Sequence, residues 1–444
     1  MHAKSRKALG LASGCAALGI TLLICSPAAG QEDAAGTFRK AREYTVRVQT
    51  QITDAFVEDE AGSFSGAGFL VDAARGWIVT NAHVVGLSPS EVQVAFADEA
   101  FQPVRKVYVD LFTDVAVLAL GAPTPGRAAA RLADGTPPDV GEPVAVFGHP
   151  ADMPFTGSRG IICGRTDQEG AALLQIDANI DHGNSGGPVI SLRDGRIVGI
   201  ATSGAGGDRA DRFNFATPMP DVCRILALLR RGVQPCPPVL SFGLLVDQDA
   251  RHTMRVGNTL DADRWPFQPG DRILRVARSG GPLQSLTDLV SALRASRETV
   301  PLVVERDGRE VTVPVRPALY PPVTERRGVR IDGALIAPKV LADGDLIGFA
   351  QRLMVQSVEP GSRAEALSVG VGDVLWSVDG RQILELDSLA ALVGARPSSE
   401  PLSLVLLRFP GQNGHLLGWH IRELPGEDVR MVGAVPELAA RDPE

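Results

Sequence analysis

Short strand-like segments follow one another from residue 44 to residue 217, with no helical pattern between them. They are rich in Val, Ile and Thr, and they occupy residues 44–52, 69–71, 77–80, 92–96, 105–110, 115–120, 144–148, 158–164, 173–177, 188–191, 196–203 and 213–217. The 48 Gly and 32 Pro residues supply turns between them, while aromatic residues make up only 5% of the chain. Regular short strands without intervening helices predict a pair of antiparallel β-barrels. The glycine-rich residues 62–68 are expected to form a flexible turn, and residues 221–231 a helix.

The second half of the chain repeats itself beyond a proline-rich linker at residues 235–238. Residues 270–276 recur as 372–378, residues 286–289 as 386–389, and residues 301–304 as 401–404. Three features in the same order indicate two copies of one module, separated by a second proline-rich break at residues 317–322. We therefore expect a domain at residues 31–234, modules at 239–318 and 325–425, and a polar tail at 426–444.

The N-terminus has the pattern of an export signal. A basic start is followed by an apolar run over residues 8–24 and by small residues before residue 31. Cleavage after residues 28–30 is expected, and an uncleaved membrane anchor is the alternative. The formal net charge of −8 argues against nucleic acid as a partner.

Cysteine spacing gives no metal site and no complete disulfide framework. Beyond the signal the chain has Cys163, Cys223 and Cys236. Cys223 and Cys236 could pair in an oxidising compartment, or all three could be small buried hydrophobic residues.

The segment Gly-Asn-Ser-Gly-Gly at residues 183–187 is the strongest candidate for chemistry. Glycines let the backbone turn tightly around Ser185 and let its amides face a developing oxyanion. Taken alone, the segment fits a structural turn, a trypsin-like nucleophile loop or the G-x-S-x-G elbow of α/β-hydrolases.

A histidine and a carboxylate that precede this serine distinguish the enzyme classes. His83 directly follows the strand at 77–80, and Asp114 begins the apolar strand at 115–120, with Asp110 as the competing acid. The order His83, Asp114, Ser185 matches the chymotrypsin arrangement, whereas the elbow enzymes place the serine first. A β-hairpin is expected after Ser185 where the elbow requires a helix, so the elbow interpretation fails.

Residues 37–425 resemble the HtrA (Deg) family. The motifs are Thr-Asn-Ala-His-Val-Val at 80–85, Thr-Asp-Val-Ala-Val-Leu at 113–118 and Gly-Asn-Ser-Gly-Gly-Pro at 183–188, with flanking matches at 66–69 and 213–216. The resemblance implies a mainly β fold: a chymotrypsin-like double β-barrel followed by two PDZ-like α+β domains. It implies no metal and no cofactor.

The resemblance also implies roles for individual residues. Ser185 would be the nucleophile, His83 the general base and then acid, and Asp114 the orienting carboxylate. The further implied positions are the oxyanion hole at Gly183, Asn184 and Ser185, the specificity pocket at Ile180, and a substrate-pairing strand at Ala201, Thr202 and Ser203. The chain departs from the family pattern at Asp181-His182, just ahead of the nucleophile loop.

Peptide-binding residues of the modules are implied in the same way. A PDZ domain adds an extended C-terminal peptide to a sheet edge and holds its carboxylate with loop amides. In the first module the matching residues are Ser241, Phe242, Gly243 and Leu244; in the second, Asp332, Gly333 and Ala334 match more loosely.

Together these features predict an exported, periplasmic serine endopeptidase of a Gram-negative bacterium, acting on unfolded polypeptides, with PDZ domains that recruit substrates or regulate. The alternative is a peptide-binding chaperone with a normally closed protease site. The resemblance further suggests trimers built through the N-terminal segment, with Phe38 and Tyr44 as interface residues or as ordinary core.

Overall fold

The computed structural model describes residues 34–150, 153–167, 170–202, 214–246, 252–277, 281–338, 352–396, 400–408 and 418–433. The expected signal at 1–30 and most of the expected tail lie outside these ranges. Among the described helices, none combines the length and apolarity needed to cross a membrane.

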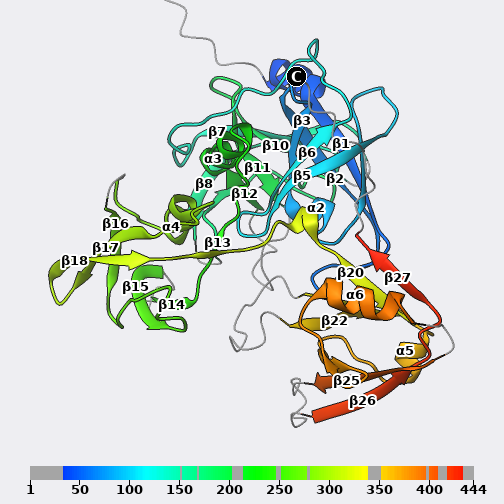
Figure 1. The fold of residues 1–444 in the computed structure, drawn as a ribbon. Helices are drawn as coiled ribbons and strands as arrows, with labels where there is room; N and C mark the ends of the chain where they lie inside the picture. Colours follow the sequence, from blue (N-terminus) through cyan, green and yellow to red (C-terminus); the bar gives the residue numbers. More distant parts are fainter. Residues whose placement is uncertain are drawn as a thin grey trace, which may run out of the picture. The chain divides into compact units, whose positions relative to one another are not determined.

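Helix α1 (Ala34–Tyr44) leads into a closed antiparallel barrel (Figure 1). The barrel comprises β1 (Thr45–Ile52), β2 (Gly62–Asp72), β3 (Trp77–Thr80), β4 (Glu91–Ala95), β5 (Gln102–Asp110) and β6 (Val115–Leu120), closed in the order β1-β2-β3-β6-β5-β4. The short helix α2 (Ala82–Val85) follows β3. Phe38 of α1 is partly buried and stacks on Phe147 with ring centroids 5.6 Å apart, and Tyr44 is buried, so both pack against the core of the chain itself.

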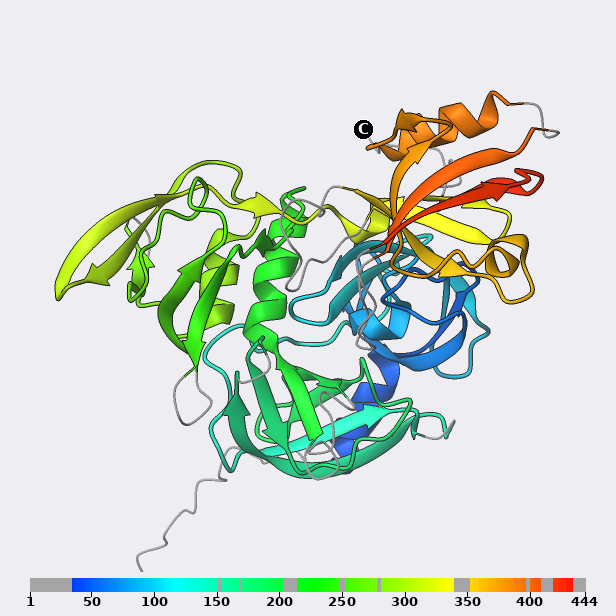
Figure 2. The same cartoon turned by 90° about the horizontal axis from the view of Figure 1, so that it is seen from below.

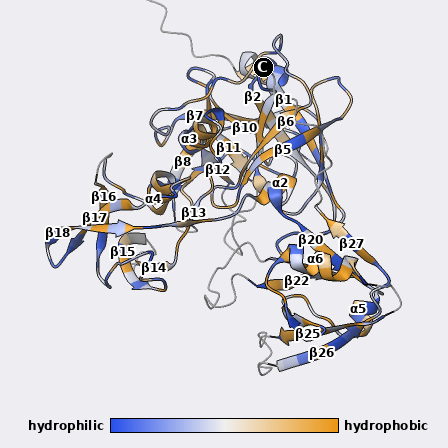
Figure 3. Ribbon diagram, viewed as in Figure 1, coloured by the Kyte–Doolittle hydropathy of each residue, from blue (hydrophilic) through white to orange (hydrophobic). Residues whose placement is uncertain are grey.

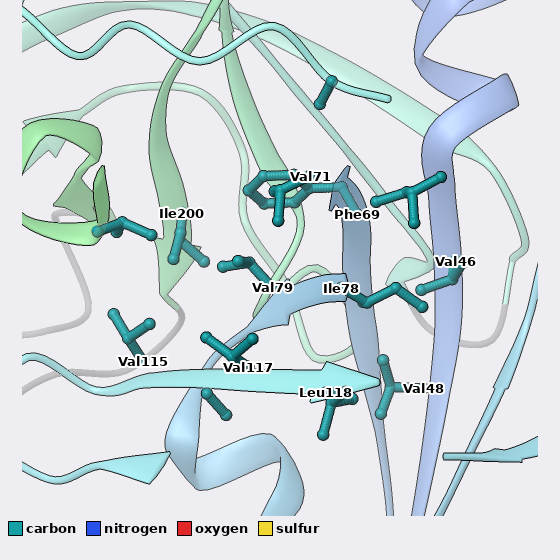
Figure 4. Close-up of a cluster of buried hydrophobic side chains, with 14 of the residues drawn as sticks. Val46, Val48, Phe69, Val71, Ile78, Val79, Val115, Val117, Leu118 and Ile200 are labelled. Atoms are coloured by element: carbon teal, nitrogen blue, oxygen red, sulfur yellow. The ribbon is translucent and has the colours of Figure 1, made fainter. Parts of the chain in front are cut away.

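The core of this barrel explains why β6 is continuously apolar. All six residues of β6 are buried, and Val115, Val117 and Leu118 point into the cluster drawn in Figure 4. Ile200 from the second barrel reaches the same cluster. Hydropathy colouring shows the same distribution, with apolar barrel strands and a hydrophilic tip on a hairpin of the first module (Figure 3).

The expected flexible turn at residues 62–68 is wrong, because these residues form the first part of β2. They pair along the whole of β1, from Gly62 opposite Ile52 to Gly68 opposite Val46. A β-carbon at Gly66 would lie 2.7 Å from the side chain of Val84. The glycines therefore serve close packing within a strand.

A second closed barrel follows, seen from two directions in Figures 1 and 2. It comprises β7 (Pro143–Gly148), β8 (Thr156–Thr166), β9 (Leu173–Ile176), β10 (Pro188–Ser191), β11 (Ile197–Thr202) and β12 (Asn214–Pro218), in the order β10-β11-β12-β9-β8-β7. Helix α3 (Met219–Arg230) has Pro218 as its N-cap and packs its apolar face on the first barrel's cluster. Strand β10 pairs with β11 as the predicted hairpin.

The first C-terminal module is a sheet with one helix against it. The sheet runs β14 (Phe242–Val246), β15 (His252–Thr259), β16 (Arg272–Val276), β17 (Val300–Arg306) and β18 (Arg309–Val315), in that order. Helix α4 (Leu286–Leu293) begins with a capping box between Ser285 and Asp288. Leu289 and Leu293 on one face of α4 join the same buried cluster as Trp265.

The second module repeats this arrangement with additional strands. Its elements are β20 (Gly328–Ile331), β21 (Ala334–Pro338), β22 (Leu353–Val358), α5 (Arg363–Ala366), β23 (Val374–Val378), β24 (Arg381–Gln382), α6 (Leu386–Gly394), β25 (Leu402–Arg408), β26 (Gly418–Leu424) and β27 (Val429–Val432). In the first module Arg306 forms an ion pair with Asp271, and in the second Arg408 does the same with Asp373. The sequence repeat therefore corresponds to a repeated contact. In each module an arginine on one strand forms an ion pair with the aspartate that directly precedes the neighbouring strand.

Two boundaries differ from the sequence expectation. The sheet of the second module continues past residue 425, because β27 pairs with β20 from Val432 opposite Gly328 to Val429 opposite Ile331. The linker at 235–238 is also packed: Pro238 and Val239 (β13) pair with Ala318 and Leu319 (β19). A short 3₁₀-helix (Val323–Glu325) precedes the second module.

Among the described cysteines, Cys163, Cys223 and Cys236 are all free thiols, so the possible Cys223–Cys236 disulfide is absent.

The packing of β6 gives a stability prediction. Leu118→Ala removes a side chain that is 0% exposed, so the free energy of unfolding of the first barrel should fall by about 2–5 kcal/mol. Val140→Ala, at a position 66% exposed, should change it by less than about 0.5 kcal/mol. Native-state hydrogen exchange of the β3 and β6 amides isolates this barrel from the other domains. Equal protection in the two variants would contradict the assignment of Leu118 to the core.

Candidate functional site

His83 lies on helix α2, immediately after strand β3. The helix is one turn long and is fixed by contacts outside itself. Thr50 Oγ1 donates to the carbonyl of Val84 at 2.7 Å, and the amide of Gly86 closes the turn on Ala82 at 2.9 Å. The imidazole is 46% exposed, so it can be reached by a substrate.

Asp114 holds His83 through both carboxylate oxygens. Oδ2 lies 2.8 Å from Nδ1 of His83, and Oδ1 accepts the backbone amide of His83 at 3.0 Å. This arrangement fixes the ring orientation and the tautomer in which Nδ1 carries the hydrogen, leaving Nε2 as the acceptor. Burial lowers the pKa of His83, but the hydrogen bond and charge of Asp114 raise it more, and the net pKa lies above the ordinary value.

The backbone of Asp114 is in the left-handed region, with φ of 53°. A residue other than glycine pays about 1–2 kcal/mol for this conformation, so the surroundings must hold it. Asn81 Nδ2 donates to the carbonyl of Asp114 at 2.8 Å, and Thr217 Oγ1 donates to that of Thr113 at 3.2 Å. The carboxylate of Asp110 accepts the amide of Thr113 at 3.0 Å.

These supporting residues were missed by the sequence reasoning. Asn81 is completely buried and also donates to Thr202 Oγ1 at 3.1 Å, which ties the first barrel to the second beside the histidine. Asp110 was considered only as a competing catalytic acid, yet it belongs to the turn that presents Asp114. The position of Asn81 inside the Thr-Asn-Ala-His motif was the available signal.

Ser185 lies in a tight loop that reaches from the second barrel to the first. Its carbonyl accepts the amide of Ala67 at 2.8 Å. A β-carbon at Gly66 would lie 2.7 Å from Val84 Cγ1 and 3.0 Å from the carbonyl oxygen of Ser185, so helix α2 and the serine loop meet across Gly66. The site therefore forms where the two barrels touch.

The residues ahead of Ser185 form a turn closed by the amide of Asn184, which donates to the carbonyl of Asp181 at 2.9 Å. Gly183 has φ of 98°, and a β-carbon there would lie 2.1 Å from the carbonyl oxygen of His149. Only glycine fits this position. Because its amide is already used in the turn, Asn184 does not fit the expected role of an oxyanion donor, and Gly183 and Ser185 remain the candidates.

The other two candidate histidines have different surroundings. His149 is buried; its amide donates to the carbonyl of Gly183 at 3.2 Å, and its Nδ1 accepts the amide of Phe155 at 2.9 Å. Burial lowers the pKa of His149 to about 4, so it stays neutral at physiological pH. His182 is exposed, and its amide donates to the side chain of Asp181 at 2.7 Å. Asp181 and His182, where the chain departs from the family pattern, thus form part of the turn before the serine, and the side chain of Asp181 stabilises that turn.

The expected substrate-contacting residues are only partly brought together. Ile180 lies in the buried cluster of the second barrel with Ala201. The amide of Ala201 donates to Gly187 at 2.8 Å and its carbonyl accepts from Gly186 at 2.9 Å. Ala201 therefore does not fit a strand that pairs with substrate. Thr202 lies next along β11, and Ser203 lies outside the described residues.

In the first module the expected peptide-binding residues lie at a sheet edge. Strand β14, which contains Phe242, Gly243 and Leu244, is the outermost strand, and Ser241 directly precedes it. Phe242 packs on Trp265 at 4.9 Å and on Phe267 at 5.2 Å. This edge has the geometry that strand addition requires.

The expected residues of the second module do not fit the same role. Asp332 and Gly333 form the turn of the β20–β21 hairpin, and β21 is enclosed between β20 and β22. The carboxylate of Asp332 accepts the amides of Gly426, Glu427 and Asp428 at 2.6, 3.0 and 3.0 Å. Ala334 on β21 thus has no open edge, and Asp332 already binds backbone amides of its own chain.

Comparisons with known proteins agree with this geometry. Residues 66–200 match the family model of the trypsin-like peptidase domain. Periplasmic serine endoprotease DegP of Salmonella typhimurium is 25% identical over 368 residues, covering 76% of this chain and 74% of DegP. A probable DegP-like periplasmic serine endoprotease of Chlamydia pneumoniae is 27% identical over 350 residues, covering 73% and 70% of the two chains. Together these matches support an HtrA (Deg) family serine protease.

Structural similarity supports the fold. The HtrA-type protease AlgW, solved with a tripeptide, superposes with a TM-score of 0.51 at 22% identity, covering 65% of this chain and 97% of AlgW. The chain is a serine endopeptidase with a chymotrypsin-like double barrel. Within the described ranges no group of three or more His, Cys, Asp or Glu side chains is placed to hold a metal ion.

The serine loop gives a prediction with an internal control. Gly186 and Gly141 have nearly the same φ, 85° and 87°, but a β-carbon at Gly186 would lie 2.1 Å from the carbonyl oxygen of Ala67, while Gly141 faces open space. Gly141→Ala should cost only the conformational penalty of about 1–2 kcal/mol.

Gly186→Ala should in addition displace the loop that carries Ser185 and abolish its rapid labelling by a fluorophosphonate. Labelling rates and free energies of unfolding of both variants provide the check. Wild-type labelling of Gly186→Ala would show that this backbone contact is unnecessary.

Proposed function

We propose that this protease is exported to the periplasm and cleaves unfolded or misfolded polypeptides through an acyl-enzyme, with Ser185, His83 and Asp114 as the catalytic triad. The observation that carries the proposal is the two-point bond from Asp114 to His83 on a helix that meets the Ser185 loop across Gly66. A serine needs a neutral base to take its proton, and that base needs a carboxylate on its other nitrogen.

The order of proton transfers follows from the tautomer. With the Nδ1 hydrogen donated to Asp114, Nε2 of His83 takes the proton of Ser185 Oγ as the oxygen attacks the substrate carbonyl. The imidazolium is stabilised by the Asp114 carboxylate and then gives its proton to the leaving amine. The amides of Gly183 and Ser185 would bind the oxyanion, because the positive φ of Gly183 turns this backbone around the serine.

A preference for unfolded chains follows from strand addition. Thr202, the last residue of β11, would pair with the substrate backbone, and an extended backbone is needed to pair there. Ile180, at the wall of the second barrel's apolar cluster, would favour small or medium aliphatic side chains before the cleaved bond.

The first module would bind C-terminal peptides at β14. Support comes from its position at the sheet edge and from the Ser-Phe-Gly-Leu sequence at residues 241–244. Binding there would recruit substrates or regulate the protease. The periplasmic names of the relatives support export, and the family resemblance supports assembly into trimers.

Cleavage of an unfolded casein-like substrate tests the function directly. The full chain should digest it, and Ser185→Ala should lower the rate by about 10⁶-fold, because the nucleophile is lost. Ser63→Ala, an exposed serine near the start of β2 in the same domain, is the matched control and should keep wild-type activity.

Intact mass after fluorophosphonate treatment should show one adduct, on Ser185. Equal digestion by wild type and Ser185→Ala would refute the assignment. Prevention of aggregation by both proteins, with no cleavage by either, would favour the chaperone alternative.

The His83–Asp114 pair also predicts the pH profile. Because Asp114 raises the pKa of His83, and the base must be neutral, kcat/KM should fall with decreasing pH at a midpoint above that of an ordinary histidine. Asp114→Asn should move this limb to lower pH and reduce kcat by about 10⁴-fold. His182→Gln is the control and should leave the limb in place. If the acidic limb moved in His182→Gln, the group that titrates would be His182 and not His83.

A further inference from the structure

A buried ion pair joins the first module to the first barrel. Arg294, directly after helix α4, pairs through Nη1 with Oδ2 of Asp110 at the end of β5. The arginine side chain is 1% exposed and the aspartate 0%. Burial lowers the pKa of Arg294, but Asp110 and Tyr108 raise it, and the net pKa is above the ordinary value, so the arginine stays charged.

Tyr108 and the linker complete the buried network. The hydroxyl of Tyr108 lies 2.7 Å from Oδ2 of Asp110 and 2.9 Å from the carbonyl oxygen of Pro235. Arg294 Nη1 donates to the same carbonyl at 2.9 Å and to the tyrosine hydroxyl at 3.2 Å. Linker, module and barrel thus share one set of hydrogen bonds, and removing any charged member leaves a buried partner uncompensated.

The other carboxylate oxygen of Asp110 accepts hydrogen bonds from the turn that leads to Asp114. Oδ1 accepts the amides of Phe112 and Thr113 at 2.9 and 3.0 Å. The next residue is Asp114, whose left-handed φ of 53° must be maintained from outside. A carboxylate can bind both amides and remain in place only if its own charge is compensated, and Arg294 supplies that compensation.

We propose that Asp110 and Arg294 are positioning residues for the triad, and that the first module thereby contributes a buried charge without which Asp114 is not held against His83. The inference rests on the proposed function, because it assigns the two residues a role in presenting the triad's acid. It also predicts that the barrels alone do not carry a fully formed site.

The chemistry of the network offers a substitution that separates positioning from stability. Arg294→Met leaves Asp110 charged and unpaired. In the double variant Asp110→Asn/Arg294→Met, the amide oxygen still accepts from Phe112 and Thr113. Its NH₂ group can donate to the tyrosine hydroxyl, whose single hydrogen then serves Pro235. Every buried group of the network then has a partner and no buried charge remains.

The test compares kcat and KM for a peptide substrate, with fluorophosphonate labelling to count active sites, in full-length proteins. Arg294→Met should lower kcat by at least about tenfold with KM within about twofold, because the triad and not the substrate contact is disturbed. The double variant should recover most of this loss, whereas Asp110→Ala/Arg294→Met, which cannot accept from the two amides, should not.

Arg306→Met is the matched control, because it breaks an arginine–aspartate pair inside the same module, at Asp271, without touching the barrel. It should leave kcat within about twofold of wild type. The proposal is overturned if Arg294→Met keeps wild-type kcat per labelled site, or if both double variants are equally impaired. A wild-type protein that neither labels nor cleaves would refute the proposed function instead.

Discussion

The site depends on a turn that holds an aspartate in an unfavourable backbone conformation. Asp114 must adopt a positive φ to direct one oxygen to the imidazole and the other to the backbone amide of His83. That conformation persists because Asn81 holds the carbonyl of Asp114, while Thr217 and Asp110 hold the carbonyl and the amide of Thr113. These contacts come from different strands, so the geometry of the acid is a property of the assembled barrel and not of the local sequence.

The histidine side is fixed by a second set of charges. Lys106 donates to the carbonyls of Gly86 and Ser88 just beyond helix α2, at 2.8 and 2.9 Å, and burial lowers its pKa to about 7, with Asp59 acting to raise it and Arg326 to lower it. Asp59 accepts the amide of Ser88 at 2.6 Å, and Arg326 from the start of the second module bonds to the same segment. The first module therefore contacts the chain near Asp114, through Arg294 and Asp110. The second module contacts the chain near His83, through Arg326 and Leu87.

The two modules share a repeated ion pair, yet their edges differ. In both, an arginine of the strand after the helix binds the aspartate ahead of the preceding strand, as in Arg306–Asp271 and Arg408–Asp373. The first module leaves β14 at an edge. In the second module β21 is covered by β20, which in turn pairs with β27, and Asp332 binds the segment that leads into β27. A similar sequence repeat is thus compatible with an open sheet edge in one module and a covered one in the other, because an edge is defined by which strand comes to lie beside it.

The sequence by itself determined the strands of both barrels, the repeat, and the order of His83, Asp114 and Ser185, because apolar alternation and motif order are local or one-dimensional properties. It misjudged the glycines at 62–68, which look like a turn but form β2, since close approach to Val84 is a tertiary contact. It also named Asp114 as the acid, with Asp110 as its competitor, but gave Asp110 no role of its own. Only the tertiary structure paired Asp110 with an arginine nearly two hundred residues away, because burial and charge pairing arise when distant segments meet.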